Sequence, residues 1–165
     1  MGSLECATAL ELLQPEPPLR LNNSSIEKAN YAGMAIILGN VGDTFPVFAE
    51  RCLTPLDQEY FERTRSEWMG VGSIAELAAD QTKTGEQGWK ACEVGLQACV
   101  ELLSENPKGP FVEGSVFGYV DCILASIWMM YKRVDEGLFQ RIMTHDARIQ
   151  EHYDACVPYL QRVHN

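Results

Sequence analysis

Two arginines in the segment QEYFERTRSEW, Arg63 and Arg65, carry the side chains that could hold an anionic ligand. A guanidinium group stays charged at any physiological pH and pairs well with carboxylate or phosphate. The other interpretation is that both are solvated or paired with a nearby carboxylate, as surface arginines commonly are. The sequence leaves both interpretations open.

The six cysteines have no spacing typical of redox or metal sites. None belongs to a CxxC pair, and four fall on apolar faces of expected helices, which predicts reduced core thiols. Cys92 and Cys99 lie two helical turns apart, too far for a disulfide. The three histidines, His145, His152 and His164, form no HExxH or other ligand pattern. The sequence therefore predicts no metal site.

Length and composition predict one domain with an ordinary core. The chain has 165 residues, of which 46% are hydrophobic, and its net charge is −10. Such an acidic chain argues against nucleic acid and anionic membranes as partners, because both need patches of Lys and Arg. The N-terminal residues lack the basic start and long apolar core of a secretory signal, so we expect a cytoplasmic protein.

The element that must organise this domain lies between Lys108 and Val134. Gly118 stands at an expected N-cap, and the Asp121 carboxylate, three positions later, can accept hydrogen bonds from free backbone N–H groups. Beyond Asp121 the helix is apolar on nearly every side, so it is buried or lies in a membrane. Only ten residues separate Asp121 from Lys132, whereas a span needs about 18–20. The sequence predicts the central helix of a helical bundle.

Local signals predict the helices around it. A capping box of Ser24 and Glu27 begins a helix that ends at Gly39, and Gly33 inside it would allow close packing on another helix. Thr54 caps a further helix with an apolar side, which comprises Leu56, Tyr60, Phe61, Thr64 and Trp68. Further helices are expected over 74–79, over 86–104, from about 135, and from 144 to about 156. Residues 40–53 are expected to hold only a short helical turn.

The segment GPFVEGSVFGYVDCILASIW resembles the GPFxxGxxxSYADxxLA motif of glutathione S-transferase C-terminal domains. The match runs through Gly109, Pro110, Phe111, Gly114, Tyr119, Asp121, Leu124 and Ala125. PLDQEYFERTRSEWMG is similar to the EYFxRTRE helix of fungal transferases of the etherase-like branch. Two positions depart: Ser66 replaces the Glu of the second motif, and Gly118 replaces the capping Ser of the first.

The resemblance implies an all-α bundle of about six or seven helices over residues 22–165. Residues 1–21, with prolines at 15, 17 and 18, resemble the tail of the last helix of a thioredoxin-like domain followed by a linker. The alternative for this segment is a disordered leader.

The resemblance also implies a cleft for an electrophilic substrate, lined by the first two helices of the domain. The candidate lining residues are Tyr31, Met34, Leu38, Tyr60, Arg63 and Tyr131. The tyrosines and Arg63 are acid or base candidates, but none has an evident partner base, so no catalytic residue is assigned. The alternative is that these residues are plain core or dimer contacts.

In this family, a thioredoxin-like domain supplies a cis-Pro loop for glutathione and a Ser, Cys or Tyr that stabilises its thiolate. A free Cys thiol has a pKa of about 8.5, which must fall for attack at neutral pH. Only about 23 residues precede the first expected helix of the bundle. We therefore expect the glutathione site to be absent or built another way. The resemblance implies glutathione as a possible cofactor and no other.

Three functional hypotheses follow. The first is a transferase-like enzyme of fungal specialised metabolism that acts on a hydrophobic, electrophilic molecule by conjugation or by a glutathione-independent rearrangement, elimination or cyclisation. The second is a non-catalytic docking module, with a homodimer or a partner protein on the face left by the missing domain. The third is a truncated transferase fragment. A closed pocket with converging polar groups favours an enzyme, whereas a broad apolar patch favours docking.

Overall fold

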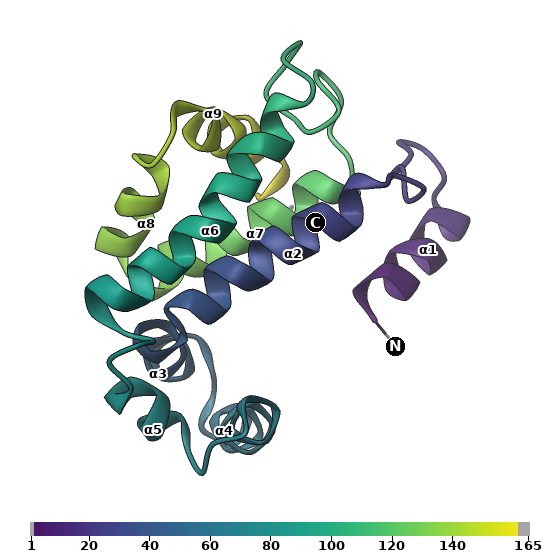
Figure 1. The fold of residues 1–165 in the computed structure, drawn as a ribbon. Helices are drawn as coiled ribbons and strands as arrows, with labels where there is room; N and C mark the ends of the chain where they lie inside the picture. Colours follow the sequence, from purple (N-terminus) through teal and green to yellow (C-terminus); the bar gives the residue numbers. More distant parts are fainter. Residues whose placement is uncertain (1, 162–165) are drawn as a thin grey trace.

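The computed structural model describes residues 2–161, and this part of the chain is all-α (Figure 1). Its nine α-helices are α1 (Ser3–Leu13), α2 (Ser25–Gly39), α3 (Val41–Cys52), α4 (Pro55–Met69), α5 (Ile74–Ala79), α6 (Gly85–Ser104), α7 (Tyr119–Val134), α8 (Glu136–Met143) and α9 (Ala147–Cys156). Residues 2–161 form no β-strand, only isolated β-bridges within 111–116. The predicted all-α class is confirmed, with a helix count slightly above the expected six or seven.

Helix α7 is the central helix, as predicted. Helix α2 packs against it and carries α6 on its own far side, while α3, α8 and α9 also contact α7 (Figure 1). Its Leu124 and Trp128 side chains are completely buried and belong to one core with Ile36 of α2 and Leu96 of α6. A helix enclosed in this way needs apolar residues around its whole circumference, which explains the missing polar face.

The predicted cap of α7 is confirmed. Asp121 is 1% exposed, and its Oδ2 accepts a hydrogen bond of 2.8 Å from the N–H of Gly118, the N-cap residue. Its Oδ1 accepts from the N–H of Val112 at 2.9 Å and lies 3.1 Å from Nε2 of His152. One carboxylate therefore joins the start of α7 to the preceding loop and to α9.

The other helix starts are partly as predicted. Thr54 Oγ1 accepts from the N–H of Asp57, and Ser73 Oγ accepts from the N–H of Glu76, which confirms both caps. The capping box at Ser24 is wrong: its side chain makes no cap bond, and Asn23 Oδ1 accepts from the N–H of Ser25 instead.

The start of the last helix is also corrected. Helix α9 begins at Ala147 rather than Thr144, because Asp146 Oδ1 caps it by accepting from the N–H of Arg148. Thr144 instead ends α8, where its hydroxyl donates to the carbonyl of Gln140.

Residues 41–52 differ most from the prediction, since they form the whole helix α3 rather than a short turn. Pro46 lies inside it. Proline removes one backbone hydrogen bond, but Val41 and Phe45 are buried against Ile74 and Leu77 of α5. This tertiary burial outweighs the local breaking signal.

Glycines allow the helices of the bundle to approach closely. A Cβ on Gly95 of α6 would lie 2.5 Å from the carbonyl oxygen of Ala32 and 2.7 Å from the backbone N of Ile36 in α2. A Cβ on Gly33 would collide with Ile127 of α7, which confirms the close packing predicted there. A side chain at Gly95 would meet backbone atoms and separate the axes of α2 and α6, whereas one at Gly33 would displace the Ile127 side chain.

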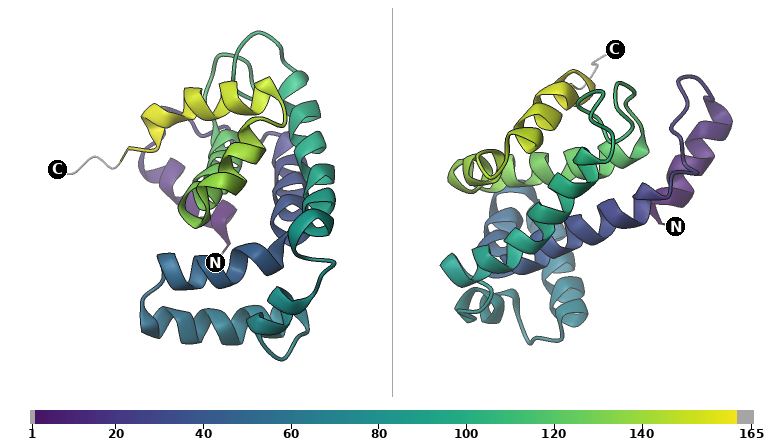
Figure 2. Two further views of the ribbon diagram at one scale, coloured as in Figure 1. Left: turned by 90° about the vertical axis from the view of Figure 1, so that its left-hand side faces the viewer. Right: turned by 45° about the horizontal axis from the view of Figure 1, so that its top comes forward.

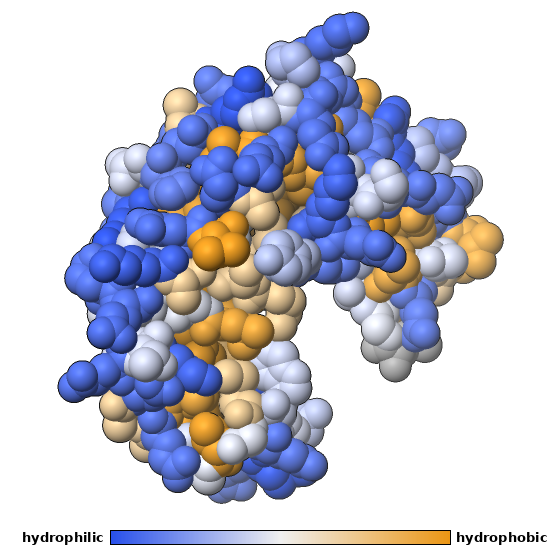
Figure 3. Space-filling model, viewed as in Figure 1, coloured by the Kyte–Doolittle hydropathy of each residue, from blue (hydrophilic) through white to orange (hydrophobic). Residues whose placement is uncertain are grey.

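Helices α3, α4 and α5 form a lobe below the bundle, and α1 stands apart from it (Figures 1 and 2). Leu12 and Leu13 of α1 are both 82% exposed. The molecule is hollowed between the lobe and α1, and apolar residues gather on the inner wall of this hollow (Figure 3). No single helix within residues 2–161 is long and apolar enough to cross a bilayer; α2 and α3 pass that test only as a pair bent by 89°.

Candidate functional site

An apolar pocket of about 400 Å³ lies where the α3–α5 lobe meets the bundle. One wall is aromatic and consists of Phe45, Phe48, Phe61 and Trp68. The Phe61 ring of α4 meets Phe45 of α3 edge-on, with 5.3 Å between their centroids, and lies 5.5 Å from Phe48. Aromatic rings locked against each other in this way make a preformed apolar surface.

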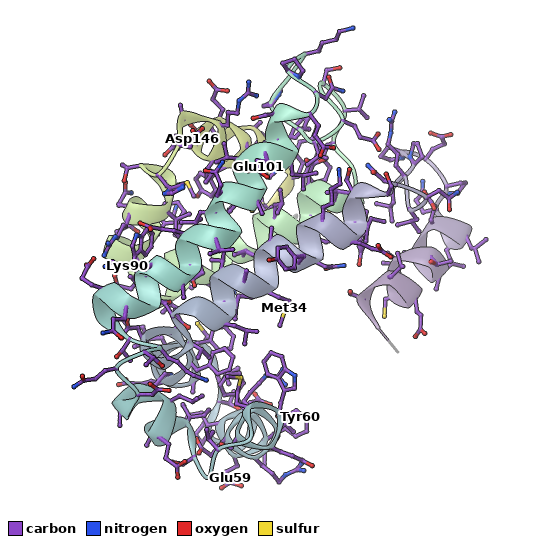
Figure 4. All side chains as sticks on the ribbon, in the orientation of Figure 1. Met34, Glu59, Tyr60, Lys90, Glu101 and Asp146 are labelled. Atoms are coloured by element: carbon purple, nitrogen blue, oxygen red, sulfur yellow. The ribbon has the colours of Figure 1, made fainter. Side chains whose placement is uncertain are left out.

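The bundle supplies the opposite wall. Met34 and Ile37 of α2 and Met130 of α7 line it. Met34, partly exposed, points from α2 toward α4 across the hollow (Figure 4). Methionine side chains are flexible and polarisable, so this wall can adapt to ligands of different shape.

Only two lining residues are polar, Thr44 and Arg65. The Thr44 hydroxyl donates to the carbonyl of Asn40 at 3.1 Å, so its proton is already used within α3. The Arg65 guanidinium lies 5.5 Å from the ring centroid of Phe61 and 5.8 Å from that of Trp68. These cation–π contacts hold a positive charge at the aromatic wall.

The structure places the predicted lining residues in different surroundings. Met34 lines the pocket, and Leu38 is half-buried outside it. Tyr31, 62% exposed, faces a shallow surface hollow with Lys28. Tyr60 and Arg63 line another hollow on the outer side of α4, with the guanidinium 5.4 Å from the tyrosine ring (Figure 4). Their substrate-binding roles stay predictions.

Tyr131 lies in the core, 1% exposed. Its hydroxyl donates to the carbonyl of Ile36 at 3.1 Å and is 3.3 Å from Oδ1 of Asn40. The Cys92 thiol donates to the same carbonyl. The last carbonyls of a helix lack intrahelical donors, so Tyr131 completes the end of α2. Burial raises its pKa well above the ordinary value of tyrosine, which disfavours a role in proton transfer.

Asp121, His152 and Cys156 resemble a catalytic triad in arrangement, but not in chemistry. Trp128 Nε1–H donates to His152 Nδ1 at 3.1 Å, so that nitrogen is an acceptor and Nε2 carries the proton that faces Asp121. Both imidazole nitrogens are therefore occupied. Burial raises the pKa of the Cys156 thiol to about 12, and this residue is completely buried. The group links α7 to α9 and is not a nucleophile.

The buried thiols predict that the protein loses stability in alkali. Burial raises the pKa of Cys92, Cys99 and Cys156 to about 12, whereas an unfolded cysteine ionises near about 8.5. Below the unfolded pKa both states keep the protons, so stability is unaffected. Above it the unfolded state loses them first, and the free energy of unfolding falls by about 1.4 kcal/mol per pH unit for each thiol.

Urea unfolding between about pH 8 and about pH 10 measures this slope. The variant Cys99→Ala removes one of the three thiols, so we expect its slope to be about a third shallower. An identical slope in the variant would contradict the assignment to buried cysteines.

Of the residues that line the pocket, sequence reasoning placed only Met34 there. It missed the lining roles of Ile37, Thr44, Phe45, Phe48, Phe61, Trp68 and Met130. Phe45 and Phe48 come from a helix that was not expected. Arg65 was considered together with Arg63, and the arginine-rich motif alone does not tell which one faces the pocket. Within residues 2–161, no three His, Cys, Asp or Glu side chains come together as metal ligands would. His164 lies outside the described residues.

Comparisons with known proteins agree with this architecture. Residues 37–159 match the family described as glutathione S-transferase, C-terminal domain. Glutathione S-transferase-like protein ustS of Aspergillus flavus is 33% identical over an alignment of 159 positions, and the match covers 87% of this chain and 54% of that protein. The chain thus spans about half the length of the curated relative it matches.

A solved structure shares the fold. The glutathione S-transferase CsGST63524 of Ceriporiopsis subvermispora, crystallised in complex with glutathione, superposes with a TM-score of 0.76 at 20% identity. The superposition covers 96% of this chain and 66% of that one. Together with the family match over residues 37–159, it confirms the resemblance, and the chain belongs to the glutathione S-transferase C-terminal domain family.

Proposed function

We propose that this chain forms the substrate-binding half of a glutathione S-transferase-like enzyme that acts on a hydrophobic, electrophilic small molecule. The pocket between the bundle and the α3–α5 lobe supports this proposal. It is preformed, mainly aromatic, and large enough for a small organic molecule. The proposal includes a cytoplasmic role in fungal specialised metabolism, and the relation to a transferase-like protein of Aspergillus flavus supports only the fungal type.

Glutathione itself fits this pocket poorly. The tripeptide carries two carboxylates, an ammonium and a thiol, whereas the pocket offers one guanidinium and the already engaged hydroxyl of Thr44. No Ser, Cys or Tyr lines it to stabilise a thiolate. The pocket suits the apolar reactant, and glutathione would need polar contacts outside this pocket. The chemistry is either conjugation with such help or a glutathione-independent rearrangement, elimination or cyclisation.

Fluorescence titration with the neutral apolar probe N-phenyl-1-naphthylamine tests the proposal. We expect saturable binding with a Kd on the order of 10 µM, as a ligand of this size allows. The variant Met34→Asp places a charge on the pocket wall and is expected to weaken binding at least about tenfold. Tyr31→Asp introduces the same charge on α2, outside the pocket, and should change the Kd less than about twofold. Equal losses in both variants, or no binding by the wild type, would refute the proposal.

Calorimetric titration of the same chain with glutathione separates the two chemistries. We expect no heat of binding below about 1 mM, because the pocket lacks the needed polar groups. Binding at lower concentrations would show that a thiol site has been rebuilt within this chain. Conjugation with glutathione would then be favoured over a glutathione-independent reaction.

A docking module is the second candidate, and one observation favours it. Leu56 and Tyr60 of α4 are 76% and 63% exposed, and Trp68 is 50% exposed. The side of α4 that the sequence predicted to be apolar is therefore largely uncovered. Partner proteins commonly bind such surfaces. Concentration-dependent association in light scattering, together with no binding of the apolar probe, would favour this candidate over the enzyme, as would a homodimer that buries α4.

A further inference from the structure

We propose that the pocket selects aromatic molecules that carry one anionic group, and that Arg65 is the residue that determines this specificity. The inference rests on the proposed function, because it names the class of substrate for the same pocket. Arg65 is the only charged residue among those that line the pocket, and no acidic residue is among them. The chain as a whole carries a net charge of −10, so a pocket lined by a positive charge and no negative one differs from the average of the chain.

The contacts of Arg65 hold its charge available to a ligand. The side chain is half-buried, and its guanidinium lies against Phe61 one turn before it and Trp68 one turn after it. Within residues 2–161 no carboxylate oxygen lies within 4.0 Å of it. Arg20, Lys28 and Arg141, by contrast, each pair with a glutamate. An arginine held by rings but lacking a counter-ion can offer paired donors to an incoming anion.

The nearest acidic side chain on the same helix face is engaged elsewhere. Glu62 Oε1 accepts from the N–H of Ile74 at 2.9 Å and from the Ser66 hydroxyl, so this carboxylate is turned toward α5. Asp43, one residue before Thr44 in α3, accepts from the N–H of Gly85 at 2.7 Å. Glu62 therefore joins α4 to α5, and Asp43 joins α3 to the start of α6. The remaining negative charges act from the surface, where salt screens them beyond about 10 Å.

Arg63 provides a matched comparison. It is two residues from Arg65 on the same helix and also lies over an aromatic ring, that of Tyr60. Its surroundings differ, because Asp57 and Glu59 line the same outer hollow. A ligand in the aromatic pocket therefore meets Arg65, whereas Arg63 lines a different hollow together with two acidic residues. Arg133 is the charged residue of an adjoining pocket that shares Phe48 and Met130, so it tests whether the anion lies there instead.

The experiment compares two probes that differ by one sulfonate: N-phenyl-1-naphthylamine and 8-anilinonaphthalene-1-sulfonate. We expect the wild-type chain to bind the sulfonate about tenfold more tightly, with a preference that shrinks between about 20 mM and about 500 mM NaCl. Arg65→Met should abolish the preference, so that the two probes bind with similar Kd values. Arg65→Lys keeps the positive charge and should retain most of the preference for the sulfonate. Arg63→Met should leave both Kd values unchanged.

The outcomes separate this inference from the proposed function. If the neutral probe does not bind, both fail. If it binds and Arg65→Met leaves the sulfonate preference intact, only the selection by Arg65 is overturned. If Arg133→Met abolishes the preference and Arg65→Met does not, the anion lies in the adjoining pocket and the assignment to Arg65 is also overturned.

Discussion

Replacement of Asp121 by alanine is expected to destabilise the protein by about 3–5 kcal/mol, because it leaves buried donors without an acceptor. The carboxylate accepts from the N–H groups of Val112 and Gly118 and from the imidazole of His152, all in the interior. For a chain of this length, such a loss lowers the melting temperature by roughly 10 °C. Thermal melts followed by circular dichroism measure it.

Asp154→Ala is the matched control for this prediction. Asp154 is an exposed carboxylate of α9 whose one hydrogen-bond partner in the structure is Gln150. Its loss should change stability by less than about 0.5 kcal/mol. Melting of the Asp121 variant within about 2 °C of the wild type would show that the carboxylate does not hold α7 in place.

Gly95→Ala is expected to destabilise the protein by about 3 kcal/mol or more, although the same change in an exposed helix stabilises by about 1 kcal/mol. The added methyl group would lie 2.5 Å from the carbonyl oxygen of Ala32 and 2.7 Å from the N of Ile36, both backbone atoms of α2. Backbone atoms in a helix cannot turn aside as a side chain can. The axes of α2 and α6 must therefore move apart, and buried contacts along the pair are lost.

Val94→Ala tests whether the effect is specific to the interface. Val94 precedes Gly95 on α6 and is 57% exposed. The substitution should change the free energy of unfolding, measured by urea denaturation, by less than about 0.5 kcal/mol. A stabilising Gly95→Ala would mean that α2 and α6 do not pack as closely in solution as they do in the structure.

Three of the helices that the sequence predicted well have a local chemical signal at their start. Thr54, Ser73 and Asp121 cap their helices through contacts three residues away, which a linear pattern contains. Helix α3 lacks such a signal. Gly42 and Pro46 looked like breaking residues, yet a side chain on Gly42 would strike the backbone of α5, and Phe45 is buried in the lobe. These reasons for a helix lie outside the segment itself.

The pocket was predictable only in part for the same reason. Met34 was expected to line it and does. The sequence predicted one apolar side of α4, comprising Leu56, Tyr60, Phe61, Thr64 and Trp68, but the structure does not bury these residues together. The side with Leu56 and Tyr60 is exposed, whereas Phe61, Arg65 and Trp68 line the pocket. Choosing between Arg63 and Arg65 required knowing how α3 packs, which the sequence did not reveal.

The small cluster of Val41, Phe45, Ile74 and Leu77 is separate from the main core, and the pocket lies across the boundary between them. A molecule in the pocket touches Met130 on one side and Phe61 on the other, so its occupancy and the local folding of the lobe form one coupled equilibrium. Through this coupling, substitutions at Ile74 and Leu77 change the affinity for a ligand, although neither residue lines the pocket. Natural selection acting on what the pocket binds therefore also acts on how firmly α3–α5 stays folded.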